Sequence, residues 1–204
     1  MEYLLQTPRS YNAQAVYPLW LVLHGAYANA EKALAMFGAE AEELATFLLA
    51  PQAARPCGDG YCWSYARDAK AIHDLIETTL ACYPIDRTRL SLIGHSMGCV
   101  MGLWLMAQNP SLCRFFAALG MGSAFEPWEF DDGGVDQKGL SVSANFTPIL
   151  LAVDQSDPAR AGVYFEDNLL WLRRLGFKVE IFRLNAGTHE VTEEMKTAVL
   201  QAMP

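Results

Sequence analysis

The chain has 204 residues, 52% of them hydrophobic and 19% charged, a balance typical of one soluble globular domain with a substantial core. Its formal net charge of -8 disfavours partners that are themselves negative, so we expect no nucleic-acid binding and no attraction to anionic membrane surfaces. No apolar run approaches the roughly 20 residues of a membrane span and no signal-peptide pattern opens the chain, which predicts a cytoplasmic protein without a membrane span.

Predicted strands and helices alternate along the chain. Strands are indicated by short apolar runs or by alternation, and helices by apolar residues at three- and four-residue steps. In chain order these patterns predict a strand at 3–6, a strand at 19–23, a helix at 30–45, a strand at 46–50 ended by Pro51, a helix at 68–82, a strand at 90–93, a helix at 97–108, strands at 115–119 and 149–153, a helix at 160–175, a strand at 178–184 and a helix at 190–202.

The order of these elements indicates the fold class. Strands that are buried on both faces and alternate with helices form mostly parallel sheets, covered by helices on both sides. We therefore expect a single α/β domain over residues 1–204, a three-layer α/β/α sandwich with a mostly parallel sheet. One segment, residues 120–147, departs from this alternation, and so long an irregular stretch is commonly a functional loop.

The cysteines and the acidic residues give no sign of a metal site. The five cysteines fall at irregular spacings, and the loop with Asp131, Asp132 and Asp136 lacks the spaced ligands of a calcium-binding EF-hand. Cys57 and Cys62 flank a short Gly-containing loop and would pair if oxidised, whereas free thiols in a reducing compartment are the favoured interpretation. We expect neither a metal nor an organic cofactor.

Residues 94–98 (Gly-His-Ser-Met-Gly) match the pattern G-x-S-x-G, in which a serine is exposed on a tight turn between a strand and a helix. The glycines let strand and helix approach, and the helix N-terminus favours developing negative charge. The pattern is weak by itself, but a predicted strand ends at Ile93 and a predicted helix starts at Met97, as the turn requires. Ser96 is therefore the predicted nucleophile; the alternative is a structural serine in a Gly-rich turn.

A serine hydroxyl needs a neighbouring base, and histidine is the usual one. Of the four histidines, His73 lies within a predicted helix, and His24 ends a strand, where we expect its backbone to matter more than its ring. His95 is too constrained inside the turn to reach Ser96. In enzymes with this turn the order along the chain is serine, acid, histidine, and His189 alone satisfies that order.

The acid that orients the histidine should follow a strand between Ser96 and His189. Asp154 and Asp157 both come after the predicted strand at 149–153. Asp154 directly ends the strand, and Asp157 lies in a turn-like sequence before a proline. These local features leave both candidates open.

Further similarity lies in residues 21–25 (LVLHG), 83–89 (YPIDRTR), 94–98 (GHSMG), 148–157 (PILLAVDQSD) and 187–189 (GTH). These stretches resemble the α/β-hydrolase superfamily, in particular its small carboxylesterases and its polyhydroxybutyrate-depolymerase-like and feruloyl-esterase-like enzymes. The resemblance spans nearly all of residues 19–190 and implies a compact fold. The short uninterrupted segments of the chain leave room for only a minimal lid. In such enzymes the acid closes a stretch Pro-strand-Gly-x-x-Asp, which favours Asp157 here, with Asp154 at the usual glycine position.

Acyl transfer also requires N–H donors for the oxyanion. The residue after the nucleophile supplies one, so Met97 is the first candidate. The resemblance implies the second in the loop after the early His-Gly strand, the backbone N–H of Ala26, with Tyr27 as the alternate.

The candidates for substrate contact are all aromatic and are the least specific part of the prediction. They are Tyr27, Trp63, Phe125 and Trp128, with Phe130 and Phe146 in the same irregular segment as the last two. Related enzymes often build a cap or an acyl pocket in this segment. An equally favoured role for these aromatic side chains is to fix the loop to the core.

The sequence thus predicts a serine esterase that cleaves small-molecule carboxylic esters through an acyl-enzyme on Ser96, with His189 and Asp157. The alternatives are a thioesterase, lysophospholipase or peptidase with the same nucleophile, and a catalytically silent protein of the same fold that only binds. A homodimer is compatible with the sequence, which does not determine the oligomeric state.

Overall fold

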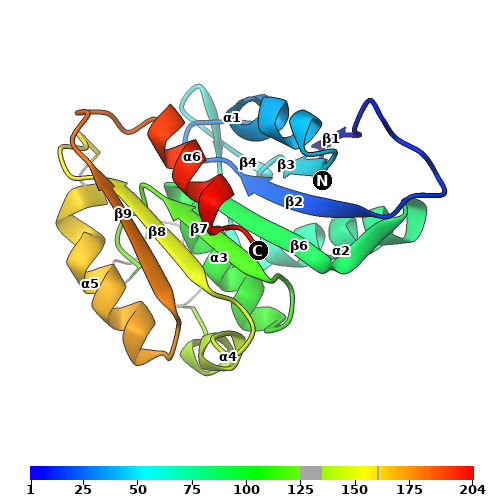
Figure 1. Cartoon of the computed structure of the whole chain (residues 1–204). Helices are drawn as coiled ribbons and strands as arrows, with labels where there is room; N and C mark the ends of the chain where they lie inside the picture. Colours follow the sequence, from blue (N-terminus) through cyan, green and yellow to red (C-terminus); the bar gives the residue numbers. More distant parts are fainter. Residues whose placement is uncertain (125–134, 160) are drawn as a thin grey trace.

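The computed structural model describes residues 1–124, 135–159 and 161–204 (Figure 1). Within these residues seven strands form one sheet in the spatial order β1-β3-β2-β6-β7-β8-β9. Their bounds are β1 Tyr3–Gln6, β2 Tyr17–Leu23, β3 Phe47–Pro51, β6 Ile85–His95, β7 Phe115–Leu119, β8 Ile149–Asp154 and β9 Val179–Leu184. Neighbouring strands are parallel, except that β1 runs antiparallel to β3 at the edge of the sheet.

Helices cover both faces of this sheet. One face carries α1 (Ala30–Glu43) and α6 (Glu193–Ala202), and the other carries α2 (Tyr65–Cys82), α3 (Met97–Gln108), α4 (Gln137–Ser143) and α5 (Ala161–Arg174). Figure 1 shows α6 in front of the central strands and α3 behind them. The predicted class, a three-layer α/β/α sandwich with a mostly parallel sheet, is confirmed.

Strand β2 shows why the sheet is buried on both faces. Leu19, Leu21 and Leu23 belong to the core on the α2–α3 side, and Trp20 and Val22 belong to the core under α1 and α6. None of the five is more than 4% exposed. Burial of each such side chain contributes about 1.5–3 kcal/mol to the stability of the folded protein. The central strands are therefore firmly fixed in the core.

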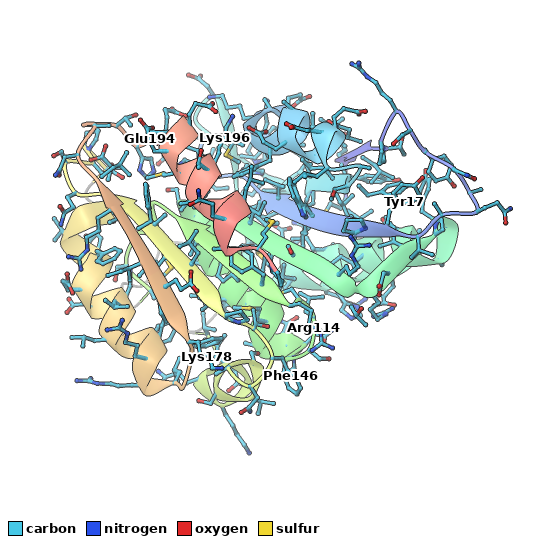
Figure 2. The ribbon with its side chains drawn as sticks, viewed as in Figure 1. Tyr17, Arg114, Phe146, Lys178, Glu194 and Lys196 are labelled. Carbon is cyan, nitrogen blue, oxygen red and sulfur yellow. A yellow bond between two sulfur atoms is a disulfide. The ribbon has the colours of Figure 1, made fainter. Side chains whose placement is uncertain are left out.

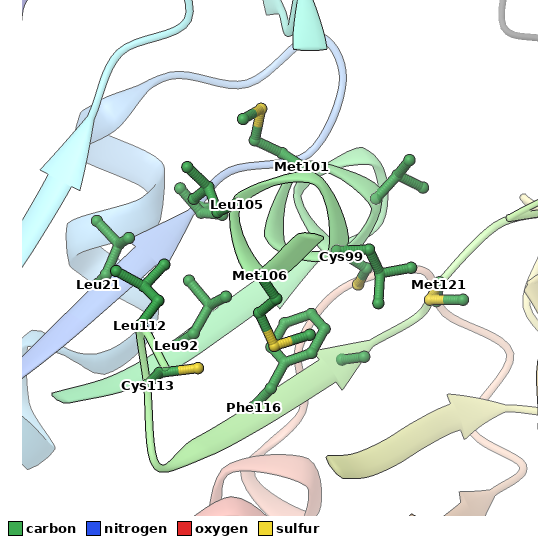
Figure 3. Close-up of a cluster of buried hydrophobic side chains, with 14 of the residues drawn as sticks. Leu21, Leu92, Cys99, Met101, Leu105, Met106, Leu112, Cys113, Phe116 and Met121 are labelled. Atoms are coloured by element: carbon green, nitrogen blue, oxygen red, sulfur yellow. The ribbon is translucent and has the colours of Figure 1, made fainter. Parts of the chain in front are cut away.

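The larger core lies between α3 and the sheet. Figure 3 shows Met106 of α3 beside Phe116 of β7, and Leu105 of α3 and Leu92 of β6 belong to the same core. Helix α3 is apolar all round, as expected for a helix that begins directly under the predicted nucleophile and runs through the interior.

The register of the strands brings their carboxyl ends to one edge. Leu23 at the end of β2 is opposite Gly94 of β6, and Asp154 at the end of β8 is opposite Leu184 of β9. The loops that follow β2, β6, β8 and β9 therefore meet at this edge, where α/β sheets commonly bind ligands.

Several elements differ from the prediction. Residues 55–57 and 60–62 form a separate hairpin of β4 (Arg55–Cys57) and β5 (Gly60–Cys62), which was not predicted because three-residue strands show no periodicity. Helix α4 lies inside the segment expected to be irregular. Pro51 is the last residue of β3 and does not end the strand before it.

The cysteines also correct an expectation. Cys57 and Cys62 form a disulfide, so the favoured interpretation of free thiols at these two positions is wrong. Cys82, Cys99 and Cys113 are free, the last two buried.

The described residues include no helix with the length and apolar character of a membrane span. They also include no group of three His, Cys, Asp or Glu side chains arranged to hold a metal ion.

Candidate active site

Ser96 occupies a strained turn between β6 and α3. Its backbone has φ 52° and ψ -118°, a conformation that a residue with a Cβ adopts only when the surrounding structure enforces it, at a cost of about 1–3 kcal/mol. The N–H of Ser96 donates to the carbonyl of Leu119, and its carbonyl accepts from the N–H of Cys99. These bonds to the neighbouring strand and to the first helical turn hold the serine at the edge of the sheet.

The two glycines of the turn are required by close backbone contacts. A Cβ on Gly94 would lie 2.7 Å from the carbonyl oxygen of Gly98, and one on Gly98 would lie 2.3 Å from the carbonyl oxygen of Leu23. Both distances are far below van der Waals contact. The turn therefore brings the start of α3 directly against the end of β2.

His189 lies between the hydroxyl of Ser96 and the carboxylate of Asp157. Its Nε2 is 2.8 Å from Ser96 Oγ, and its Nδ1 is 2.6 Å from Asp157 Oδ2. Because an ionised carboxylate only accepts hydrogen bonds, Nδ1 carries the proton and Nε2 is free to accept the proton of the serine. The Asp157 side chain is only 1% exposed, whereas that of His189 is 28% exposed.

Asp154 has a different place from Asp157. Its carboxylate accepts the N–H groups of Ser156, Ala186 and Thr188 at 2.9–3.0 Å. Burial acts to raise the pKa of Asp154, but these backbone donors outweigh it and hold the pKa below its usual value. Asp154 thus stabilises the loop that leads to His189. All three of these bonds go to backbone N–H groups, and none goes to the histidine ring.

The ring of His24 orients one peptide of the loop after β2. Its Nε2 accepts the N–H of Ala53 at 3.1 Å, so its proton lies on Nδ1, which donates to the carbonyl of Gly25 at 2.7 Å. Burial lowers the pKa of His24 to about 4, so the ring is neutral at pH 7. Because a peptide unit is planar and trans, the N–H of Ala26 points the opposite way, away from His24.

The loop geometry separates the two candidate oxyanion donors of this segment. The N–H of Tyr27 donates to the carbonyl of Tyr61 at 3.0 Å and is therefore occupied. Ala26 lines the same pocket as Ser96, and a Cβ on Gly25 would lie 3.1 Å from the Cβ of Ser96. Of the two, Ala26 is the candidate whose N–H is not taken by the carbonyl of Tyr61.

A pocket of about 590 Å³ opens over these residues. The loop after β2, α1 and the start of α6 enclose it, with Ser96, His189, Tyr27, Met36, Val191 and Lys196 among its lining residues. Figure 2 shows Lys196 and Glu194 on α6, at the opposite end of the molecule from Arg114, Phe146 and Lys178. The volume matches that of a small-molecule site.

The aromatic residues predicted to contact substrate differ in their position relative to this pocket. Tyr27 lines the pocket and is 64% exposed. Trp63 is fully buried, with its ring stacked on His24 at 4.4 Å, so the expectation that it borders the pocket is corrected. Phe146 lies far from the pocket, and Phe125 and Trp128 lie outside the described residues, together with Phe130.

The sequence analysis did not predict the roles of two histidine rings, those of His24 and His95. The ring of His24 orients the Gly25–Ala26 peptide, although only its backbone was expected to matter. His95 donates from Nε2 to the carbonyl of His189 at 2.7 Å and so ties the turn to the histidine loop. Burial lowers the pKa of His95 as well, which favours this neutral role. The available signal was that both histidines end central strands beside a glycine or the serine.

Comparison with known proteins gives matches of structure but none of sequence. No protein-family model and no curated protein sequence matches the chain. The structure is similar to esterase PE8, with a TM-score of 0.71 at 19% identity over 98% of this chain and 97% of that one. It is also similar to a CE1 ferulic acid esterase from Anaeromyces mucronatus in complex with ferulic acid, with a TM-score of 0.70 at 18% identity over 98% and 82%.

A third match differs in length. A thermostable esterase gives a TM-score of 0.67 at 23% identity over 91% of this chain, which spans only 50% of that protein. Together these matches confirm the compact α/β-hydrolase fold and the resemblance to carboxylesterases and feruloyl esterases that the sequence indicated.

Proposed function

We propose that the chain is a serine esterase that hydrolyses small-molecule carboxylic esters through an acyl-enzyme on Ser96. The observation that carries this proposal is the continuous hydrogen-bonded series from Ser96 through His189 to Asp157. A serine, a histidine and a buried carboxylate in this geometry can activate a hydroxyl for attack on a carbonyl. The whole chain acts as one α/β-hydrolase domain in this proposal.

The reaction has two steps. Ser96 Oγ attacks the ester carbonyl while His189 Nε2 takes its proton, and the same nitrogen then protonates the leaving alcohol. A water molecule, deprotonated by His189, attacks the acyl-enzyme and releases the acid. Throughout, the carboxylate of Asp157 orients the ring and stabilises its charged form.

The oxyanion of each tetrahedral intermediate needs donors that are in place before the reaction. We assign this role to the N–H groups of Ala26 and Met97. Met97 is the first residue of α3, and the first N–H groups of a helix have no partner within it. The orientation of the Gly25–Ala26 peptide by His24 supports the assignment of Ala26.

We expect the substrate to be a small ester, which the volume of the pocket supports. Since one matched structure holds ferulic acid, esters of aromatic acids belong in the substrate panel beside short aliphatic ones. The panel also includes acyl-CoA thioesters, lysolipids and peptide amides, which represent the thioesterase, lysophospholipase and peptidase alternatives.

The disulfide bears on the compartment. Disulfides persist in oxidising compartments and are rare in the cytosol, so the Cys57–Cys62 bond argues against the cytoplasmic location predicted from the sequence. Counting free thiols in protein isolated without reductant tests the point. In denaturant, three free thiols are expected, those of Cys82, Cys99 and Cys113, and five would restore the cytoplasmic prediction.

The experiment that tests the function compares p-nitrophenyl ester hydrolysis by four variants. Ser96→Ala, His189→Ala and Asp157→Asn should each lose at least roughly a thousandfold in kcat. Asp154→Asn is the matched control and should lose less than about tenfold, since an amide oxygen can still accept a backbone N–H.

Two results would contradict the assignment. Full activity in Asp157→Asn together with an inactive Asp154→Asn would move the acid to Asp154. A wild-type protein that hydrolyses nothing in the panel and is not labelled at Ser96 by a fluorophosphonate would favour the silent binding protein.

A further inference from the structure

The hairpin β4–β5 stands apart from the main sheet and has little to stabilise it alone. Its two strands have three residues each, pair antiparallel with Cys57 opposite Gly60, and include a proline that lacks an N–H. A two-stranded hairpin of this size is at best marginally stable in water. The disulfide between Cys57 and Cys62 joins its strands covalently.

One side of this hairpin holds the end of the loop after β2. Tyr61 of β5 accepts the N–H of Tyr27 at 3.0 Å and donates its own N–H to the carbonyl of Ala28 at 2.9 Å. These bonds flank Tyr27, which has a φ of 61°, a conformation disfavoured for a residue with a Cβ. Gly60 touches the same residue, because a Cβ there would lie 2.4 Å from the Tyr27 carbonyl.

The residues on either side of the hairpin hold the beginning of the same loop. Trp63, directly after β5, donates from Nε1 to the carbonyl of His24 at 2.8 Å and stacks on the His24 ring. Ala53, two residues before β4, donates its N–H to His24 Nε2. Residues 53–63 therefore bind the loop after β2 at both of its ends, at His24 and at Tyr27–Ala28. The proposed oxyanion donor Ala26 lies between these two points.

From these contacts we propose that the disulfide-closed hairpin β4–β5 is a positioning element for the oxyanion loop, so that turnover depends on the redox state of Cys57 and Cys62. The inference rests on the proposed esterase function. The hairpin touches neither Ser96 nor His189 through these bonds, and it acts through residues 24–28 alone.

Reduction by a dithiol would reverse this positioning. Two electrons from the dithiol cleave the S–S bond, Cys57 and Cys62 each gain a proton as thiols, and the dithiol becomes a cyclic disulfide. Attack falls on the Cys57 sulfur, since Cys57 is partly exposed and Cys62 is buried. The freed hairpin lets Tyr27 relax its backbone, and the Ala26 N–H then moves from its place.

The kinetic signature follows from the role of an oxyanion donor. Such a donor stabilises the transition state more than the bound ester, so its displacement lowers kcat and leaves KM nearly unchanged. Complete loss of one donor costs 10²–10³-fold elsewhere, and we expect partial displacement here to cost about tenfold or more.

The test measures p-nitrophenyl butyrate hydrolysis by the oxidised protein, by the protein reduced with dithiothreitol, and by the reduced protein after reoxidation. The kcat should fall about tenfold or more on reduction, at an unchanged KM and an unchanged far-UV circular dichroism spectrum, and should return on reoxidation. The double variant Cys57→Ser/Cys62→Ser should match the reduced protein and ignore the reductant. Cys82→Ser, which removes the exposed free thiol, should behave as wild type.

Equal kcat in the oxidised and reduced wild-type proteins would overturn the inference while leaving the esterase function intact. Peptide mapping that finds no Cys57–Cys62 bond in the oxidised protein would overturn it too. An oxidised protein without any ester turnover would instead refute the proposed function, and this inference with it. If the double variant does not fold, the reversible reduction of the wild-type protein decides alone.

Discussion

Two histidines beside the proposed nucleophile serve as neutral hydrogen-bonding groups, and a third serves as the proposed base. His24 is buried and His95 is partly buried; loss of solvation lowers the pKa of each ring, and each donates to a backbone carbonyl. His189 is partly exposed and is the ring that reaches Ser96. The same side chain thus has two uses within one site, and the hydrogen-bond partners of each ring distinguish them.

The buried ring of His24 should make stability fall in acid. Its pKa is about 4 in the folded protein against an ordinary value of 6.5, so below pH 6.5 the unfolded chain binds a proton that the folded protein does not. The free energy of unfolding should therefore fall by about 2 kcal/mol through this group between pH 7.5 and pH 5, and more slowly once the pH passes the folded pKa.

Urea unfolding of wild type and His24→Gln at both pH values checks this. The variant should lose about 2 kcal/mol less than wild type over the same interval, because the other titrating groups are common to the two proteins. Equal losses would mean that His24 is protonated in the folded protein or exposed to solvent.

At the scale of elements, the contact between α3 and β2 positions both proposed oxyanion donors. Gly98 lets the first turn of α3 touch the backbone of Leu23 and His24, which places Met97 beside the loop that carries Ala26. Farther along the same helix, Gly102 meets only side chains, those of Phe116 and Leu92.

Alanine at these two glycines should therefore have unequal effects. Gly98→Ala pushes backbone against backbone and should cost about 2–3 kcal/mol of stability together with most of kcat, whereas Gly102→Ala should cost less and keep activity. Thermal unfolding and ester hydrolysis of the two variants measure both effects. A Gly98→Ala protein as stable and active as wild type would contradict the close approach.

The elements were predictable to different degrees. The buried strands and long helices follow from periodicity, and α3 was predicted with its observed bounds. The hairpin β4–β5 was not, because its pairing depends on the disulfide and on Tyr27 rather than on a local pattern. Helix α4 was missed because its seven residues include Gly139, which the sequence favours for a loop but which lies against Ala107 of α3.

The candidate site shows the same division. The order of serine, acid and histidine along the chain singles out Ser96 and His189, since few residues satisfy it. Local features left Asp154 and Asp157 open, and only the resemblance favoured Asp157. In the structure Asp157 contacts His189 Nδ1, whereas Asp154 accepts backbone N–H groups of the histidine loop. The role of the His24 ring likewise depends on Ala53 and Gly25, which the sequence does not place around it.

For the molecule as a whole, the parallel sheet is what assembles the site. Residues separated by 93 positions, Ser96 and His189, come within 2.8 Å because β6 and β9 end at the same edge. The pocket above this edge lies between α1 and α6, which cover the same face. Two of the matched structures are an esterase and a carboxylesterase, yet the proposed chemistry rests on this edge and its loops rather than on the fold.

The most direct test of the central claim is intact-protein and peptide mass spectrometry of the chain, acid-quenched during turnover of a p-nitrophenyl ester. In the wild-type protein a single acyl group should be found on Ser96. In His189→Ala this acyl group should form only slowly, and in Ser96→Ala it should be absent. Ester turnover without an acyl group on Ser96, or turnover by Ser96→Ala at the wild-type rate, would contradict the account.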